Sequence, residues 1–224
     1  MTPPSICIFA AGYGTRLRPL TNHTPKPLIQ VGEETLITRL LRQLSAVGIQ
    51  HVYINVCHLK NQIIDTLGQG QAWGMDITYI DEGDTPLETA GTIRFALEQG
   101  IITNQPLITV NADLYTDYPF ANLFDVKPDW AHLVMVPNPP HHPQGDFSCE
   151  NGIIGSDSPR YTYSGIGVYN PTLIRAYPAE KKLGAILRQA LSTRTITAEI
   201  FNGIWHDIGS PERLSALRTS LNHS

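Results

Sequence analysis

Short apolar runs alternate with helical patterns along the first half of the chain. Runs rich in β-branched and aliphatic residues predict buried strands, here at Ser5–Ala10, Val52–Val56, Ile77–Ile80 and Leu107–Val110. Between them, apolar residues recur at intervals of three and four, which predicts helices over 36–47, 63–67 and 91–99, each followed by a glycine. This alternation is typical of a Rossmann-like, doubly wound α/β fold, in which helices cover both faces of a mostly parallel sheet.

The pattern loosens after about residue 125. Short strands are predicted at 132–136, 152–154, 161–163, 166–169, 195–200 and 204–206, and helices at 183–191 and 211–221. We expect these strands to form a small additional β layer over the same sheet. The chain is therefore predicted to be one domain, 1–224, with halves of about 1–125 and 126–224. Adjacent His141 and His142 lie in a Pro-rich loop without a third metal ligand nearby, so a flexible, solvated loop is favoured over a metal site.

Composition narrows the class of protein. With 42% hydrophobic and 16% charged residues, the chain resembles an ordinary globular protein with its own core. A formal charge of −4 argues against a nucleic-acid partner, although a nucleotide site needs only a few cations. The N-terminal apolar run lacks a basic flank and is too short for a signal peptide or membrane span, so we expect a cytoplasmic protein without a membrane partner. Cys7 and Cys57 lie in apolar runs and are predicted to be inert core thiols.

The loop after the first predicted strand carries the strongest local signal. Its small residues, Ala11, Gly12 and Gly14, let backbone amides approach a ligand and form an anion-binding nest. It is not a dinucleotide fingerprint, because Leu17 stands in place of the third glycine, and no Gly-Lys-Ser/Thr completes a P-loop. Three cationic residues follow, in a stretch of chain stiffened by prolines: Arg16, Arg18 and Lys26. A proline stands on each side of Lys26, which is unusual for a lysine that is simply solvated at the protein surface.

Two carboxylates are candidates for a metal site. Asp113 comes directly after the strand at 107–110, at the sheet edge where ligands of α/β proteins bind. Asp207 follows a short strand and precedes a helix that begins with proline, so it could also cap that helix. Mg²⁺ is usually held by one or two carboxylates together with substrate phosphates. The pair is therefore compatible with Mg²⁺-assisted transfer of a phosphorus-centred group.

Residues 8–31 resemble the signature of the sugar-1-phosphate nucleotidylyltransferases, G-x-G-T-R-L-x-P-L-T followed by P-K-P. The resemblance implies that the loop wraps a nucleoside triphosphate through Ala11, Gly12, Gly14 and Thr15, that Arg16 contacts phosphate, and that Lys26 stabilises the α-phosphate during attack. The N-x-D sequence at 111–113 and the W-x-D-x-G sequence at 205–209 also resemble family motifs. They imply that Asp113 and Asp207 bind Mg²⁺, and that Asp113 belongs to the catalytic set with Arg16 and Lys26.

Residues 82–93 resemble the family segment E-x-x-x-L-x-T-A/G-G, which closes over the base. The resemblance places Glu88, Ala90 and Gly91 beside the base. The segment is also compatible with an ordinary helix N-terminus capped by Thr89. Ala90 stands in place of the first of the glycines common in this group, and Thr92 in place of another small residue, so the base pocket can differ.

The second half resembles one group of this family, the bacterial N-acetylmuramate α-1-phosphate uridylyltransferases. The similar segments are Gly145–Phe147, Tyr163–Ile166, Leu187–Ala190 and Gly203–Gly209. The resemblance implies that Asn111 and Asp146 contact the sugar phosphate, that 1–125 binds the nucleotide and that 126–224 binds the sugar. It also implies the reaction: UTP and N-acetylmuramate 1-phosphate give UDP-N-acetylmuramate and pyrophosphate, in peptidoglycan recycling.

Other readings stay open at this point. The same chemistry could act on mannose 1-phosphate with GTP, or on glucose 1-phosphate with dTTP or UTP, and phosphocholine cytidylyltransferases share the N-terminal signature. A non-catalytic, nucleotide-binding regulatory domain is a different class, but it has no need to keep Lys26, Asp113 and Asp207 together. The expected partners are small molecules, and the expected state is a monomer or a small homo-oligomer.

Overall fold

The computed structural model describes residues 4–158 and 160–221, which divide into two compact units. The first unit contains the described chain up to Pro86, the segment Asn111–Phe120 and the described chain from Ile204 onward. The second unit contains Leu87–Val110 and Ala121–Gly203. The units are thus interleaved along the chain and differ from the two consecutive halves that the sequence pattern predicts.

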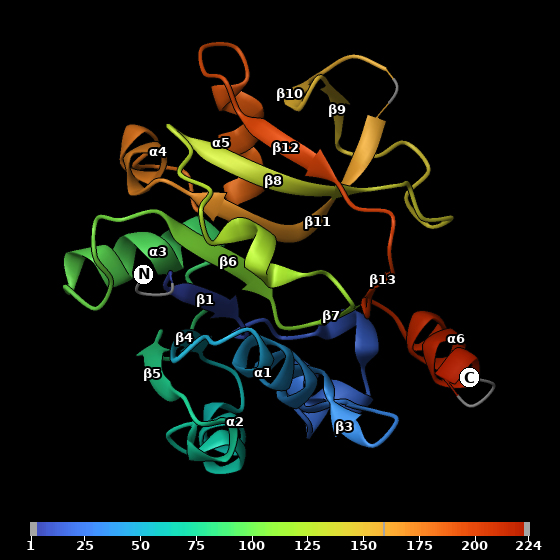
Figure 1. Ribbon diagram of the computed structural model, residues 1–224. Helices are drawn as coiled ribbons and strands as arrows, with labels where there is room; N and C mark the ends of the chain where they lie inside the picture. The colour runs from blue at the N-terminus through green and yellow to red at the C-terminus, as the bar shows by residue number, and fades with distance from the viewer. Residues whose placement is uncertain (1–3, 159, 222–224) are drawn as a thin grey trace. The chain divides into compact units, whose positions relative to one another are not determined.

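The first unit is built on a parallel sheet with the strand order β5 (Asp76–Asp81), β4 (His51–Val56) and β1 (Ile6–Phe9). These are the first three predicted strands, joined through α1 (Leu36–Ala46) and α2 (Lys60–Leu67) (Figure 1). Gly48 and Gly68 follow the two helices, and both have a positive φ, which glycine adopts readily at the C-terminal end of a helix. Short 3₁₀ turns, η1 (Thr15–Leu17), η2 (Leu20–Asn22), η3 (Lys26–Leu28) and η4 (Gln71–Trp73), complete the connections.

Two small ribbons and a helix belong to the same unit. One ribbon pairs β2 (Gln30–Val31) with β3 (Glu34–Thr35), and the other pairs β7 (Leu114–Thr116) with β13 (Trp205–Asp207). Helix α6 (Pro211–Leu221) follows β13. A separate hydrophobic cluster joins these pieces; its buried members are Leu17, Ile29, Val31, Leu36, Tyr115, Ile208, Leu214 and Leu217. The cluster packs the turn after the glycine loop against the C-terminal segment.

The second unit holds a mixed sheet with the order β6, β11, β8, β12, β10, β9. The strands span Leu107–Asn111, Arg160–Tyr169, Ala131–Val136, Thr197–Ile200, Ile153–Gly155 and Phe147–Glu150, respectively. β11 runs antiparallel to β6 and β8, β12 runs parallel to β8, and β9 also pairs with β11. Strands β12, β10 and β9 therefore extend the sheet beyond β8, and β9 also returns to pair with β11. Helices α3 (Thr89–Glu98), α4 (Pro171–Ala176) and α5 (Leu183–Ala190) complete the unit.

The structure confirms the predicted α/β class and changes several details. The strands predicted at 161–163 and 166–169 are one strand, β11, whose pairing with β8 shifts between Tyr163 and Gly167. Strand β9 and helix α4 were not predicted, because each is short and shows no clear periodicity. Cys7 and Cys57 are buried free thiols, as expected, and burial raises the pKa of both.

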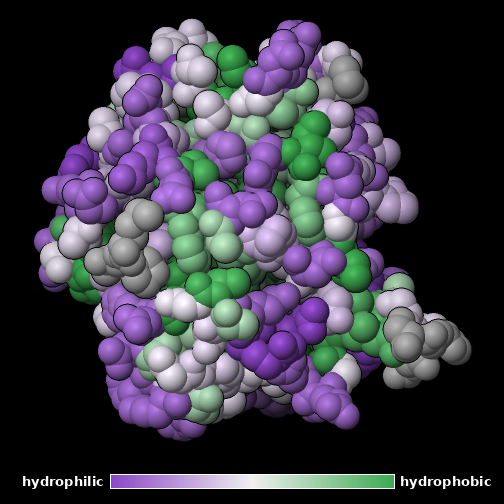
Figure 2. All heavy atoms as spheres, viewed as in Figure 1, coloured by the Kyte–Doolittle hydropathy of each residue, from purple (hydrophilic) through white to green (hydrophobic). Residues whose placement is uncertain are grey.

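Hydrophilic side chains cover most of the face shown in Figure 2, and apolar residues appear as scattered patches among them. Within the described part of the chain, no helix combines the length and the apolarity needed to span a bilayer.

Leu17→Ala should lower the free energy of unfolding by about 2–5 kcal/mol, because it removes a side chain that is 2% exposed from the cluster under the glycine loop. Urea denaturation measures this loss. The matched control is Leu20→Ala, three residues further on and 41% exposed, which should change stability by less than about 0.5 kcal/mol. Equal effects of the two substitutions would contradict the packing of the signature segment.

Candidate active site

The glycine loop is anchored from beneath by a buried asparagine. The backbone amides of Ala10 and Ala11 donate to Asn55 Oδ1 at 2.6 and 3.3 Å. Asn55 is 4% exposed, and its Nδ2 donates to Glu82 Oε1 at 2.8 Å. The Ala11 amide is therefore already bonded within the unit, and the exposed part of the loop begins at Gly12. Asn55 was not among the predicted site residues; its signal is a polar residue inside an apolar strand.

Gly14 lets the loop fold closely onto the segment that carries Lys26. Its φ is +61°, and a Cβ there would lie 2.9 Å from Thr21 Cγ2 and 3.3 Å from Lys26 Cβ. The Thr21 hydroxyl donates to the Gly14 carbonyl at 2.9 Å and fixes this approach. Thr15 and Arg16, in the following turn, are exposed. The glycine at this position thus brings two parts of the signature together.

Lys26 and Asp113 form an ion pair, although 87 positions separate them in sequence. The Lys26 ammonium donates to Asp113 Oδ2, and the side chains are only 14% and 25% exposed, respectively. The other carboxylate oxygen, Asp113 Oδ1, is buried and has no hydrogen-bond partner among the described residues. A buried acceptor without a partner is costly unless a donor or a cation reaches it. This oxygen is thus a candidate ligand for a cation.

Asp207 is held beside Asp113 through the backbone. In the β7–β13 ribbon Asp207 pairs with Leu114, and the Ile208 amide donates to the Asp113 carbonyl at 3.0 Å. Both carboxylate oxygens of Asp207 accept from the Arg213 guanidinium. Arg213 was missed in the sequence, where it is one charged residue of a helical segment. The Asp207 carboxylate is therefore engaged by an arginine of the helix that follows it.

Gly209 explains the glycine of W-x-D-x-G. A Cβ at this position would overlap the Arg213 guanidinium and lie 3.2 Å from Arg16 Nη2. The glycine thus leaves room for two guanidinium groups next to Asp207. In the first unit, three cations, Lys26, Arg16 and Arg213, gather with two carboxylates. Among the described residues no group of three His, Cys, Asp or Glu side chains could hold a metal, so any ion held here would need further ligands from substrate phosphates.

The predicted base-binding segment lies at the start of α3 in the second unit. The amides of Ala90 and Gly91 both donate to the Lys181 carbonyl, at 2.8 and 3.2 Å. Thr89 does not cap the helix, contrary to the simple alternative, since Glu88 is the N-cap residue and the Thr89 hydroxyl accepts from the Leu183 amide at 2.9 Å. Glu88 has a φ of +65° and a largely exposed side chain. With the Ala90 and Gly91 amides occupied, Glu88 is the predicted base contact that has an exposed side chain, and that side chain lies 3.8 Å from Lys182 Nζ.

Asp146, the predicted sugar contact, directly precedes β9 in the same unit. Its Oδ2 accepts from the Tyr163 amide at 2.9 Å, and its Oδ1 lies 3.4 Å from His142 Nε2 and 3.6 Å from Arg188 Nη2. Arg188 was not predicted as a site residue. Asn111, the other predicted sugar contact, is the half-buried last residue of β6.

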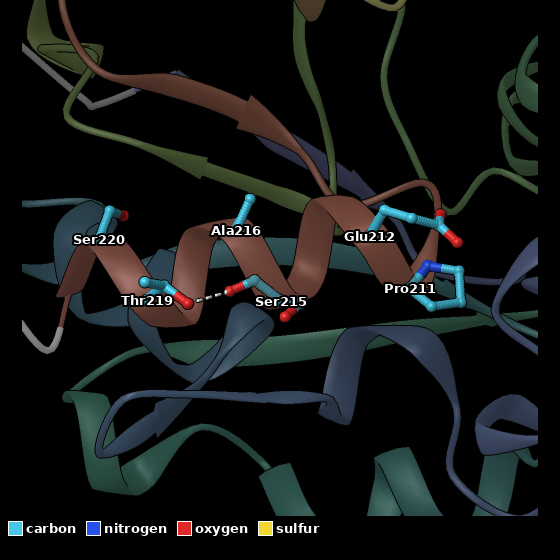
Figure 3. A pocket seen from close by; sticks show the side chains of 6 residues that line it. All are labelled: Pro211, Glu212, Ser215, Ala216, Thr219 and Ser220. Carbon is cyan, nitrogen blue, oxygen red and sulfur yellow. Dashed lines mark hydrogen bonds between the residues drawn. The ribbon is translucent and has the colours of Figure 1, made fainter.

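A hollow of about 840 Å³ runs along α6 but contains none of the predicted site residues. Figure 3 shows the residues that line it: Pro211, Glu212, Ser215, Ala216, Thr219 and Ser220. All come from one face of one helix, and the Thr219 hydroxyl is already bonded to the Ser215 carbonyl at 3.0 Å. The hollow therefore offers no converging polar groups for a ligand.

Comparison with known proteins gives a consistent result. A family model described as "Nucleotidyl transferase" matches residues 6–223. Over 222 residues, the chain is 38% identical to the N-acetylmuramate alpha-1-phosphate uridylyltransferase of Neisseria meningitidis serogroup B; the match covers 92% of this chain and 94% of that protein. It is 29% identical over 225 residues to a mannose-1-phosphate guanyltransferase of Yarrowia lipolytica, covering 92% of this chain and 60% of that protein.

Solved structures share the fold at lower identity. A putative glucose-1-phosphate thymidylyltransferase from Bacillus anthracis, in complex with a sucrose, superposes with a TM-score of 0.81 at 20% identity, covering 96% of this chain and 94% of that chain. HddC from Yersinia pseudotuberculosis, complexed with GMP-PN, superposes with a TM-score of 0.79 at 21% identity, covering 97% and 99% of the two chains. Taken with the family model and the 38% identity, these matches show that the chain belongs to the nucleotidyl transferase family, as a sugar-1-phosphate nucleotidyltransferase.

Proposed function

We propose that the protein transfers a uridylyl group from UTP to N-acetylmuramate 1-phosphate, with release of pyrophosphate. The observation that carries the chemistry is the Lys26–Asp113 ion pair next to Asp207 and two arginines, with one Asp113 oxygen that has no hydrogen-bond partner in the described part of the chain. The relative from Neisseria meningitidis supports the choice of nucleotide and sugar, because the similarity covers nearly the whole of both proteins. The reaction would serve peptidoglycan recycling, and we propose a cytoplasmic location because the proposed substrate UTP is made there.

The chemistry needs positioning and charge neutralisation rather than a covalent intermediate. A phosphate oxygen of the sugar 1-phosphate forms a new bond to the α-phosphorus of UTP, while the bond from that phosphorus to the bridging oxygen breaks and pyrophosphate leaves. Lys26 would neutralise charge on the α-phosphate, and its mostly buried ammonium, held by Asp113, supports this role. Arg16, exposed in the turn after the loop, would contact the triphosphate.

We further propose that Asp113 and Asp207 hold Mg²⁺. The pair fits this ion, because Mg²⁺ prefers oxygen ligands and is commonly bound by one or two carboxylates plus substrate phosphates. The observation that supports it is the buried Oδ1 of Asp113, for which residues 4–158 and 160–221 offer no hydrogen-bond partner. Bound there, Mg²⁺ would offset negative charge on the triphosphate.

The substrate assignment is tested by measuring pyrophosphate release with UTP, GTP, dTTP and CTP, each combined with the 1-phosphates of N-acetylmuramate, N-acetylglucosamine, mannose and glucose. We expect the highest kcat/KM with UTP and N-acetylmuramate 1-phosphate. Preference for GTP and mannose 1-phosphate would instead favour the activity named for the relative from Yarrowia lipolytica. Binding of UTP without pyrophosphate release under any condition would point to a regulatory nucleotide-binding domain.

Lys26→Ala should lower kcat by about 10²–10³, because it removes a cation aimed at charge that develops in the transition state. Circular dichroism and urea denaturation establish that the variant is folded. The matched control is Lys60→Ala, which removes a lysine that pairs with Asp81 at 2.8 Å, outside the predicted site; its kcat should stay within about twofold of the wild type. Near wild-type turnover in folded Lys26→Ala would refute the role of this lysine.

Arg213→Ala should strengthen binding of a divalent cation to the substrate-free protein. The Arg213 guanidinium engages both oxygens of Asp207, so a cation must compete with it for this carboxylate. Electron paramagnetic resonance of Mn²⁺ measures the binding, and we expect the dissociation constant to fall about fivefold. Arg218→Ala, on the same helix but bonded to the Gln30 carbonyl, serves as control. Unchanged or weaker Mn²⁺ binding in Arg213→Ala would exclude the competition.

A further inference from the structure

The second unit holds a fixed carboxylate at the predicted sugar contact. Gly145 has a φ of +60°, and a Cβ there would lie 2.8 Å from the Tyr161 carbonyl, so only glycine fits this turn. The Asp146 amide donates to the same carbonyl at 2.7 Å, and the Tyr163 amide donates to Asp146 Oδ2 at 2.9 Å. One carboxylate oxygen is thus pinned to β11. Oδ1 takes no part in these two bonds.

Two nitrogen-bearing side chains from separate segments approach Oδ1. Arg188, on α5, lies 3.6 Å away, and His142, in the Pro-rich loop, lies 3.4 Å away. A charge-assisted N–H···O bond is usually about 2.7–2.9 Å long, so both groups are near the carboxylate without being hydrogen-bonded to it. Their side chains are 61% and 40% exposed. Their N–H groups therefore remain accessible to a ligand.

The position of Arg188 is nevertheless defined. Its guanidinium lies over the Phe147 ring at 5.8 Å from the centroid, and its Nη1 is 3.4 Å from the Gly184 carbonyl. A third nitrogen-rich group, the Arg160 guanidinium, donates to the Asp146 backbone carbonyl. Arg188 thus lies near the carboxylate of Asp146 and Arg160 at its backbone, so two arginines accompany one acidic residue and the local charge is positive.

The loop that carries His142 is also held in place. The Asn138 side-chain amide donates to the Pro143 carbonyl at 3.1 Å and to the Arg160 carbonyl at 3.0 Å, and the Thr162 hydroxyl donates to Asn138 Oδ1 at 2.9 Å. The sequence predicts a flexible loop here, whereas these bonds tie it to β11. His142 is therefore presented at a fixed place beside Arg188.

The chemistry of the cluster indicates what it binds. The Asp146 carboxylate can accept a bond from a sugar hydroxyl but repels a phosphate, so the phosphate of the substrate is not expected here. The planar guanidinium of arginine matches a carboxylate group with two parallel N–H bonds. N-acetylmuramate differs from N-acetylglucosamine by a lactyl ether that carries one carboxylate, next to a free hydroxyl on the ring.

We propose that Arg188, assisted by His142, binds the carboxylate of an acidic substituent on the sugar while Asp146 accepts from the neighbouring hydroxyl. This inference rests on the proposed function and deepens it, because it assigns the selection of an acidic sugar phosphate over its neutral parent to one arginine. Without the acidic substituent, Arg188 stays solvated and contributes nothing to binding. Selectivity then comes from attraction of the acid, not from exclusion of the neutral sugar.

The test compares N-acetylmuramate 1-phosphate with N-acetylglucosamine 1-phosphate, each with saturating UTP. Arg188→Ala should lower kcat/KM for the acidic sugar by about 10- to 100-fold, mainly through KM, and leave the neutral sugar within about twofold. Arg188→Lys should recover part of the loss, because it restores the charge but not the planar pair of donors. His142→Gln should also lower kcat/KM for the acidic sugar more than for the neutral sugar, but by a smaller factor than Arg188→Ala.

The matched control is Arg175→Ala on α4, an exposed arginine that contacts Asn104, and it should keep the wild-type ratio for the two sugars. An equal loss with both sugars would overturn the inference and assign Arg188 to the phosphate or to folding. If the wild-type enzyme prefers the acidic sugar and Arg188→Ala keeps the same ratio of kcat/KM for the two sugars, only the inference is overturned. Wild-type enzyme that does not prefer the acidic sugar would overturn the proposed function as well, so the two failures are distinguishable.

Discussion

The ion pair between Lys26 and Asp113 is the interaction on which the first unit of this protein depends. It joins the Pro-Lys-Pro segment to the segment after β6, and the backbone bond from Ile208 to Asp113 adds the C-terminal segment to the same point. Both side chains are largely buried, and a partly buried charge without its partner is strongly unfavourable. The pair therefore constrains three distant stretches of chain to meet at one place.

Around this pair, the balance of charge accounts for details that the family motifs leave unexplained. Each of the two carboxylates is matched by a cation, Lys26 for Asp113 and Arg213 for Asp207. The match is incomplete only at Asp113 Oδ1, which is buried without a partner among the described residues. Gly14 and Gly209 occupy the positions where a side chain would collide with Thr21 or with Arg213. These glycines serve close approach of charged groups as much as contact with a ligand.

The second unit uses a different arrangement around its carboxylate. Asp146 is oriented by backbone amides, whereas the cationic groups near it stay exposed and at ion-pair distance. The first unit thus binds its charges tightly within the protein, and the second presents them outward. This contrast fits a family in which the nucleotide chemistry is shared and the sugar varies among members.

The sequence by itself determined the α/β class, most strands and helices, and the three motifs that contain Lys26, Asp113 and Asp207. These features depend on local periodicity and on patterns within short windows. It could not identify Asn55, Arg213 or Arg188, since each is an ordinary polar residue until another segment is placed beside it. It also divided β11 in two and missed β9, because strand pairing between distant segments leaves little local trace. Only the tertiary structure decided which charges pair, which amides are already occupied and which donors stay exposed, because the contacts that anchor the glycine loop and Lys26 join residues 45 and 87 positions apart.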